Sequence, residues 1–322
     1  LPASPARKLP FYLAAEEWAA RFLPADEYFM AWQVAPTVIC GRHQVMSLEV
    51  DTAFCKKNGI EVWRRKSGGG CVFADCNNIM FSYICPSSGV MSDFRHYTSM
   101  ISALLRCLEI PAEAGGRNDV LINGRKVAGN AYYSLPGRSI VHGTMLYDAD
   151  FELMSKAITP SRAKLSSHGV KSVPSRLTTL KAEGLSMSCP EFKLFAETVI
   201  GGDATIVPAP EDIAMIVEMM KTYTSKGFLS DSTINRRSTR HLENVGEIAV
   251  DCIVDPDGLI AGCRLSGDFF APVDFNDRLS DVLRGVHVNP VAVENALGKL
   301  PEEMMIAGMS RGSLNKLILE SI

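Results

Sequence analysis

A run of three glycines, Gly68–Gly70, separates two short segments rich in apolar and β-branched residues. Glu61–Arg65 precede the run and Cys71–Ala74 follow it, which predicts a strand, a glycine loop and a second strand. Because glycine lacks a Cβ atom, this backbone can approach an anion closely. The cations Arg64–Lys66 add positive charge. We interpret the segment as a phosphate-binding loop, with a plain glycine turn and solvated charges as the alternative.

Familiar nucleotide and hydrolase motifs do not fit. A P-loop needs Gly-Lys-Ser/Thr at the start of a helix, and no G-x-G-x-x-G fingerprint occurs, so another nucleotide-binding fold is needed. Gly308–Gly312 matches the nucleophile elbow G-x-S-x-G. Hydrolases with that elbow place their acid and histidine after the serine, whereas the last histidine here is His287. We therefore reject a serine hydrolase.

The dipeptide Asn123-Gly124 predicts a two-residue hairpin, because both positions tolerate a positive φ. Its strands are expected at Val120–Ile122 and Arg125–Ala128, so Asp119 and Lys126 could face a common site. Asp119 could hold Mg²⁺ through one carboxylate oxygen. Lys126 could neutralise charge where a carboxylate attacks an α-phosphate. An exposed hairpin lysine is the alternative.

An extended run contains His142-Gly143-Thr144. Histidine in a strand is more often a hydrogen-bonded structural residue than a catalyst, and no Cys or Ser lies nearby in sequence as an obvious nucleophile.

The remaining patterns predict alternating helices and strands, then a polar stretch and a small α+β unit. Ser92 is expected to cap one helix. We expect a catalytic domain at 1–226, a linker at 227–239 and a C-terminal domain at 240–322. The other expected helices are 12–22, 151–158, 190–200, 211–220, 276–283 and 290–297, and the other expected strands are 37–41, 79–84, 247–254 and 259–265.

Composition excludes several classes of protein. The net charge of −3 and pI near 6.1 give no reason to expect nucleic-acid binding. No uninterrupted apolar run approaches the roughly 18 residues of a membrane span. Nine cysteines without C-x-x-C spacing predict reduced thiols in a cytosolic protein. Because the chain begins at Leu1, removal of an upstream targeting segment stays open.

Several motifs together resemble the lipoate-protein ligase family. Order and spacing both match, and coverage is nearly the whole chain. The later matches are an adenylate-side loop at 161–180 and a small C-terminal domain beginning near Gly267-Asp268-Phe269-Phe270. The earlier ones are Arg64–Phe73, Asn78, Phe81-Ser82, Gly116–Asp119, Gly124–Gly129 and His142–Thr144.

The resemblance implies an α+β fold with a mixed sheet flanked by helices, similar to biotin ligases and class II aminoacyl-tRNA synthetases. It also implies two half-reactions. Lipoate and MgATP would give lipoyl-AMP, and a carrier lysine would then displace AMP. The implied carriers are lipoyl domains of 2-oxoacid dehydrogenase E2 subunits and the glycine-cleavage H protein. A cytoplasmic monomer that binds neither nucleic acid nor membrane is expected.

Site residues carry over from the resemblance position by position. Lys126 would be catalytic and would contact both ATP and the lipoyl carboxylate. Asn118 and Asp119 would support the phosphates, with Mg²⁺ on Asp119. The other ATP and adenylate residues would be Arg65, Gly70, Cys71, Val72 and Phe73, and the other lipoate residues would be Ser67, Gly68, Gly69, His142 and Thr144.

The chain departs from the family pattern at a few positions. Asn130 stands where serine is usual, Cys71 where alanine is usual, and Ala74 where histidine is common. Asn77 replaces a frequent glycine and Pro174 an arginine. These differences bear on acyl-chain preference and on the first half-reaction.

Other functions stay open at this point. One is an octanoyl- or lipoyltransferase of the same fold, either independent of ATP or dependent on lipoyl-AMP. Octanoyltransferases that resemble the ligases use a cysteine shortly before the lysine hairpin, where this chain has Glu113–Gly116. A non-catalytic nucleotide-binding regulator is the alternative from another class.

Overall fold

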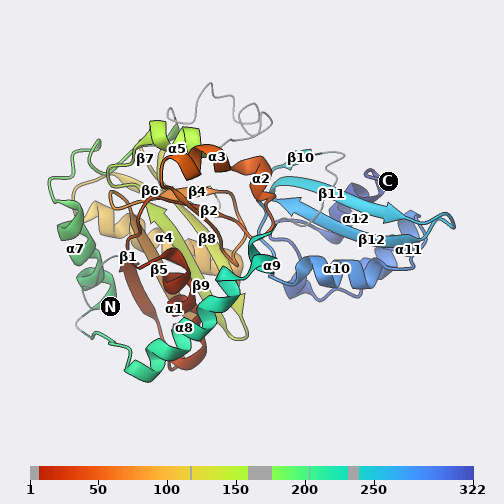
Figure 1. Cartoon of the computed structure of the whole chain (residues 1–322), viewed down its shortest axis with the longest axis horizontal. Helices are drawn as coiled ribbons and strands as arrows, with labels where there is room; N and C mark the ends of the chain where they lie inside the picture. Colours follow the sequence, from red (N-terminus) through yellow and green to blue (C-terminus); the bar gives the residue numbers. More distant parts are fainter. Residues whose placement is uncertain (1–6, 117, 159–175, 203, 231–238) are drawn as a thin grey trace.

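The computed structural model describes residues 7–116, 118–158, 176–202, 204–230 and 239–322. Two bodies of unequal size lie side by side, with the larger formed by residues before 231 (Figure 1). We call residues 7–230 the N-terminal part and residues 239–322 the C-terminal part. Most of the expected adenylate-side loop, including Pro174, and most of the expected linker lie outside the described residues, as does Arg117.

An antiparallel six-stranded sheet, in the order β1-β5-β9-β8-β7-β6, organises the N-terminal part. Strand β9 is buried along its whole length, because helices cover both faces of the sheet. The strands are β1 (Tyr28–Trp32), β5 (Ile79–Pro86), β6 (Ala112–Gly115), β7 (Asp119–Ile122), β8 (Arg125–Leu135) and β9 (Arg138–Met145).

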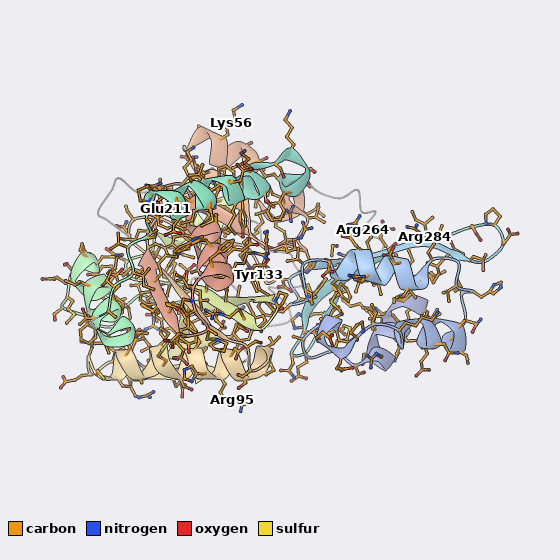
Figure 2. The ribbon with its side chains drawn as sticks, turned by 90° about the horizontal axis from the view of Figure 1, so that it is seen from below. Lys56, Arg95, Tyr133, Glu211, Arg264 and Arg284 are labelled. Carbon is orange, nitrogen blue, oxygen red and sulfur yellow. A yellow bond between two sulfur atoms is a disulfide. The ribbon has the colours of Figure 1, made fainter. Side chains whose placement is uncertain are left out.

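Helices α1 (Leu9–Phe22) and α8 (Pro210–Thr224) pack on one face of this sheet, and α4 (Val90–Arg106) and α7 (Cys189–Gly201) pack on the other. Figure 2 shows α4 and α8 on opposite sides of the sheet, with Arg95 pointing outward from α4. Alternation along β5 serves both faces, since Ile84 joins the α1 core while Tyr83 joins the α4 core.

A second, three-stranded sheet carries the glycine loop. Strand β2 (Thr37–Cys40) is central, with β3 (Glu61–Arg64) parallel to it and β4 (Val72–Ala74) antiparallel. Short helices α2 (Met46–Glu49) and α3 (Thr52–Lys57) connect β2 to β3. The segment between β3 and β4 passes over the end of the central strand β2, and this segment is the predicted glycine loop.

The C-terminal part is a three-stranded antiparallel sheet, ordered β10-β11-β12, with helices against one face. Its strands are β10 (Thr239–Leu242), β11 (Gly246–Val254) and β12 (Ile260–Gly267), and its helices are α10 (Phe275–Leu283), α11 (Pro290–Leu297), η2 (Glu302–Met304) and α12 (Arg311–Leu319).

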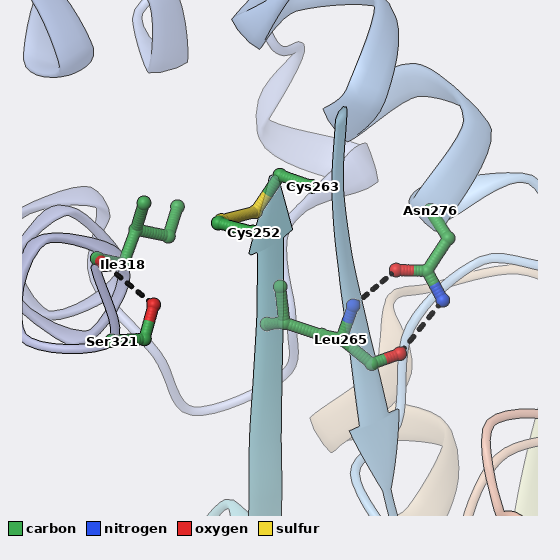
Figure 3. Close-up of a disulfide and its surroundings, with 6 residues drawn as sticks. All are labelled: Cys252, Cys263, Leu265, Asn276, Ile318 and Ser321. Atoms are coloured by element: carbon green, nitrogen blue, oxygen red, sulfur yellow. Dashed lines mark hydrogen bonds between the residues drawn. A yellow bond between two sulfur atoms is a disulfide. The ribbon is translucent and has the colours of Figure 1, made fainter. Parts of the chain in front are cut away.

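A disulfide joins Cys252 and Cys263, which are directly paired on β11 and β12 (Figure 3). Nearby, the amide of Asn276 donates to and accepts from the Leu265 backbone, at 2.8 Å in both directions, and ties α10 to β12. The expectation of reduced thiols is therefore wrong for Cys252 and Cys263, whereas the other seven cysteines are free.

Most predicted elements are present, and the Asn123-Gly124 turn is confirmed, with φ of 52° and 75°. The predicted cap of α4 is wrong. Gly89 is the N-cap, and Ser92 lies exposed inside the first turn. Several short elements were not predicted, namely β1, α2, α3, β6, β10, η2, α12 and α9 (Lys226–Leu229), of which α9 begins the expected linker.

The two parts insert side chains into each other. The His43 ring of the N-terminal part stacks on Phe269, with ring centroids 4.7 Å apart. Phe270 of the C-terminal part packs on Phe94 of α4, at 5.3 Å, and belongs to the core beneath that helix. The Gly69 N–H also donates to the Phe269 carbonyl at 3.2 Å. The glycine loop is therefore held from both parts.

Candidate active site

A cavity of about 110 Å³ lies between the two sheets of the N-terminal part. Apolar side chains from α1, β1, β2, β5 and β8 line it together with polar side chains. The apolar side chains include Leu13, Trp32, Ile39, Met80 and Ala131, and the polar ones include Arg65, Asn118, Lys126, His142 and Thr144. Such a space suits a ligand with an apolar chain and a charged head.

Arg65 braces the glycine loop from within. It is 4% exposed, and its guanidinium makes four hydrogen bonds, to Ser67 Oγ (2.8 Å) and to the carbonyls of Ile39 (3.0 Å), Gly68 (2.6 Å) and Gly70 (2.9 Å). Burial lowers the pKa of Arg65 to about 10. These bonds use four of its five N–H donors, so Arg65 fixes the shape of the loop in this structure.

The glycines of the loop are needed for close approach. A Cβ atom on Gly68 would lie 2.3 Å from the Phe269 carbonyl oxygen, and one on Gly69, whose φ is +86°, would lie 3.0 Å from the Phe270 ring. Lys66, the third cation, pairs with Glu17 on α1 at 2.6 Å and is not among the described residues that line the cavity.

Lys126 and Asp119 meet across the hairpin, as the turn predicted. The Lys126 Nζ lies 2.8 Å from Asp119 Oδ1, and the two side chains are 33% and 27% exposed. Gly129 leaves room for the lysine, since a Cβ there would lie 2.5 Å from Nζ. A partly exposed ammonium that lines the cavity and pairs with one carboxylate can exchange that carboxylate for an incoming anion.

Two asparagines that line the cavity, Asn118 and Asn130, are hydrogen-bonded to each other. Asn130 Nδ2 donates to the Asn118 carbonyl at 2.8 Å, and Asn118 Nδ2 donates to the Asn130 carbonyl at 2.5 Å. These bonds fix the orientation of both amides. Asn130 Oδ1 is buried without a hydrogen-bond partner among the described residues, and it lies 1.9 Å from where a Cβ of Gly143 would stand.

His142 belongs to a buried polar chain. Its Nε2 lies 2.7 Å from Ser67 Oγ, and its Nδ1 lies 2.7 Å from the carboxylate of Glu16 on α1. Sequence analysis found no nucleophile near His142, and it missed Glu16. The available signal was the pair Glu16-Glu17 inside an apolar helix, because acids are almost never buried without partners.

The segment after the glycines contributes unequally. Gly70, Cys71 and Val72 line the cavity, while Phe73 packs in the core behind β2. Cys71 Sγ lies 3.3 Å from Cys40 Sγ, and this contact together with burial raises the pKa of Cys71. Thr144 donates to the Met80 sulfur at 3.1 Å.

The structure brings most of the predicted site residues to one cavity. Ser67, Gly68, Phe73 and Asp119 are not among the described residues that line it. Within the described ranges, no group of three or more His, Cys, Asp or Glu side chains is arranged to bind a metal ion. No helix in those ranges is long and apolar enough to cross a membrane.

Residues 9–199 match a family model described as "Lipoyl protein ligase A/B catalytic domain". This match gives the class of the domain that holds the cavity. A second model, "Bacterial lipoate protein ligase C-terminus", matches residues 233–318. The chain therefore belongs to the lipoate-protein ligase family, and the α+β fold with a small C-terminal domain is confirmed.

Individual relatives agree with this assignment. Lipoate-protein ligase LplJ of Bacillus subtilis is 28% identical over 93% of this chain and 89% of its own length. P. falciparum LipL1 in complex with lipoate is similar in fold, with a TM-score of 0.76, 18% identity and coverage of 98% and 97%. Lipoate-protein ligase A bound with ATP gives a TM-score of 0.60, with 22% identity and coverage of 69% and 93%.

Proposed function

We propose that this ligase uses MgATP to convert lipoate into lipoyl-AMP and then transfers the lipoyl group to a carrier lysine. The observation that carries the proposal is the cavity itself, which is lined both by apolar side chains and by polar ones that include Lys126. Activation as a mixed anhydride makes the carboxylate a good acyl donor, because AMP is a good leaving group. The ligase related in fold that binds ATP supports the nucleotide.

Lys126 is the residue that changes partners in this proposal. Its ammonium would leave Asp119 and bind the lipoyl carboxylate and the α-phosphate, where negative charge develops in the transition state. Asn118 would support the phosphates. Gly70–Val72 would contact the nucleotide, Thr144 would contact the acyl group, and Arg65 would act by holding the loop.

Asp119 fits the role of a single Mg²⁺ ligand. Its carboxylate supplies a hard oxygen beside the cavity, and Mg²⁺ in such sites takes one or two carboxylates with phosphate and water oxygens. When Lys126 moves to the acyl phosphate, this carboxylate becomes free for the ion that accompanies ATP.

Carriers, compartment and domain division are part of the same proposal. Lipoyl domains of E2 subunits and the H protein would present the acceptor lysine to a cytoplasmic monomer. Seven free cysteines suit a reducing compartment, whereas the Cys252–Cys263 disulfide does not. Residues 1–226 would form the catalytic domain, 227–239 the linker and 240–322 the accessory domain.

The test is to incubate the purified protein with lipoate, MgATP and an apo lipoyl domain, following carrier mass and AMP release. Modification that requires ATP and releases AMP supports the proposal. Modification only from preformed lipoyl-AMP, or from an acylated carrier, would instead make the chain a transferase. Lipoate and ATP that bind without turnover would indicate a regulator.

A further inference from the structure

Three buried side chains from separate segments form a hydrogen-bonded chain that the proposed function leaves unused. Glu16 lies on α1, Ser67 begins the glycine loop and His142 lies on β9. Both links, Glu16 to His142 and His142 to Ser67, measure 2.7 Å. The side chains are 2%, 1% and 6% exposed, in the order Glu16, Ser67, His142.

Donors and acceptors can be assigned along these hydrogen bonds. With Glu16 as a carboxylate, which only accepts hydrogen bonds, His142 Nδ1 would donate to it. Ser82 donates to the other Glu16 oxygen, at 2.5 Å. The second nitrogen of a neutral His142 is then an acceptor, and the Ser67 hydroxyl donates to it. Arg65 Nε donates to the same Ser67 oxygen at 2.8 Å, which stabilises negative charge on it.

This order of acid, histidine and serine is the one that makes a serine hydroxyl give up its proton in other enzymes. Here it ends beside the cavity. His142 lines the wall, and the loop that starts at Ser67 continues into Gly69 and Gly70 on the same wall. Ser67 is buried and is not among the described residues that line the cavity, so a role for its Oγ requires a shift of the loop that would open the Gly69 to Phe269 hydrogen bond.

We propose that Glu16, His142 and Ser67 form a relay that removes a proton from the acceptor lysine during lipoyl transfer. The inference rests on the proposed function, because it needs an acyl adenylate and an amine acceptor. A lysine side chain is an ammonium at neutral pH, and only the neutral amine can attack a carbonyl carbon. Ser67 is the catalytic residue of this step, and Glu16 and His142 position and drive it.

The step balances as follows. The ammonium gives one proton to Ser67 Oγ while the Ser67 proton passes to His142 Nε2, leaving a neutral amine and an imidazolium beside Glu16. The amine nitrogen bonds to the acyl carbon, and the bond from that carbon to the phosphate oxygen breaks. AMP leaves with the electron pair. The remaining excess proton on nitrogen and the proton on His142 are released to solvent.

The experiment uses preformed lipoyl-AMP with two nucleophiles, an apo lipoyl domain and hydroxylamine. Hydroxylamine is largely neutral at pH 7, so it needs no proton acceptor. Glu16→Gln and Ser67→Ala should slow transfer to the carrier at least about 100-fold, the usual size of general base catalysis. Hydroxamate formation by the same variants, corrected for the enzyme-free rate, should stay within about threefold of wild type, since it bypasses the relay.

Ser139→Ala is the matched control. Ser139 is also a buried serine hydrogen-bonded to an acid, Asp93, at 2.6 Å, but it does not line the cavity. It should leave both rates unchanged. Equal losses with both nucleophiles in the relay variants, or no loss with either, would overturn the relay. If the wild type forms neither product from lipoyl-AMP, the proposed function fails and the relay fails with it.

Discussion

At the residue scale, the cavity is built from side chains that are held by named partners before any ligand arrives. Arg65 is committed to the loop, whereas Lys126 has one carboxylate partner and remains one-third exposed. This difference separates a residue that shapes the site from one that can exchange its partner for a substrate.

Lys126→Ala should reduce lipoyl-AMP formation at least about 100-fold, because it removes the cation nearest the developing charge. The fold should persist, since Lys126 lies at the exposed end of the hairpin. Pyrophosphate release measures the reaction, and thermal unfolding checks the fold. Lys181→Ala is the control, because Lys181 also pairs with one aspartate, at 2.7 Å, away from the cavity. Wild-type adenylation by Lys126→Ala would contradict the assignment.

Ionisation of Glu17 makes the free energy of unfolding depend on pH. Burial alone would raise its pKa, but hydrogen bonds from Lys66 and Arg21 outweigh burial, so the native pKa lies below the ordinary 4.5. A lowered native pKa means that the carboxylate stabilises the fold above 4.5, and that this contribution is lost as pH falls through the native value. Glu17→Gln should therefore flatten the fall in stability below pH 4.5, measured by urea unfolding at several pH values. An unchanged pH profile would contradict this link.

Local patterns predicted the parts of the site that lie close together in sequence. Asn123-Gly124 was sufficient to predict that the strands carrying Asp119 and Lys126 pair. The bulge between Val120 and Leu121, which shifts Asp119 opposite Gly129, was not predicted. The chain through Glu16 could not be predicted, since it joins residues separated by 75 and 126 positions and depends on how α1 packs on β9.

At the element scale, strand β9 must pass very close to β8 beside the cavity. Gly143 pairs with Asn130 in the ladder, and the Asn130 amide occupies the space above it. Elements such as β10 and α12 escaped prediction for a related reason, because their positions depend on neighbours in the sheet or core more than on local sequence.

Gly143→Ala should lower the free energy of unfolding by about 2 kcal/mol, since the new methyl group would displace the Asn130 side chain. Loss of the asparagine pair should also raise the KM for lipoate. Gly262→Ala is the matched strand control, because its Cβ would meet nothing closer than 4.0 Å. Equal stability of the two variants in urea would show that the close approach at Gly143 is absent.

At the scale of the whole molecule, each part completes the core of the other. His43 is buried against Phe269, and its burial lowers its pKa to about 3, so it remains neutral at physiological pH. Phe270 is 3% exposed within the core beneath α4. The Phe269 carbonyl, next in sequence to Phe270, accepts the backbone hydrogen bond from Gly69.

Phe270→Ala should destabilise the protein by about 3 kcal/mol, the usual result of emptying a buried phenylalanine site. Adenylate formation should also fall, because the loop loses its neighbour. Differential scanning calorimetry and the pyrophosphate assay measure the two effects. Phe22→Ala, at a side chain 56% exposed, should change neither. Full stability in Phe270→Ala would contradict the inserted packing.

The hydrogen bond from Gly69 to Phe269 couples ligand binding in the cavity to the association of the two parts. A ligand that prefers a different loop conformation must weaken the contact between the parts, and by reciprocity, separating the parts must change the affinity for that ligand by the same factor. The affinity for such a ligand therefore depends on how strongly the two parts bind each other.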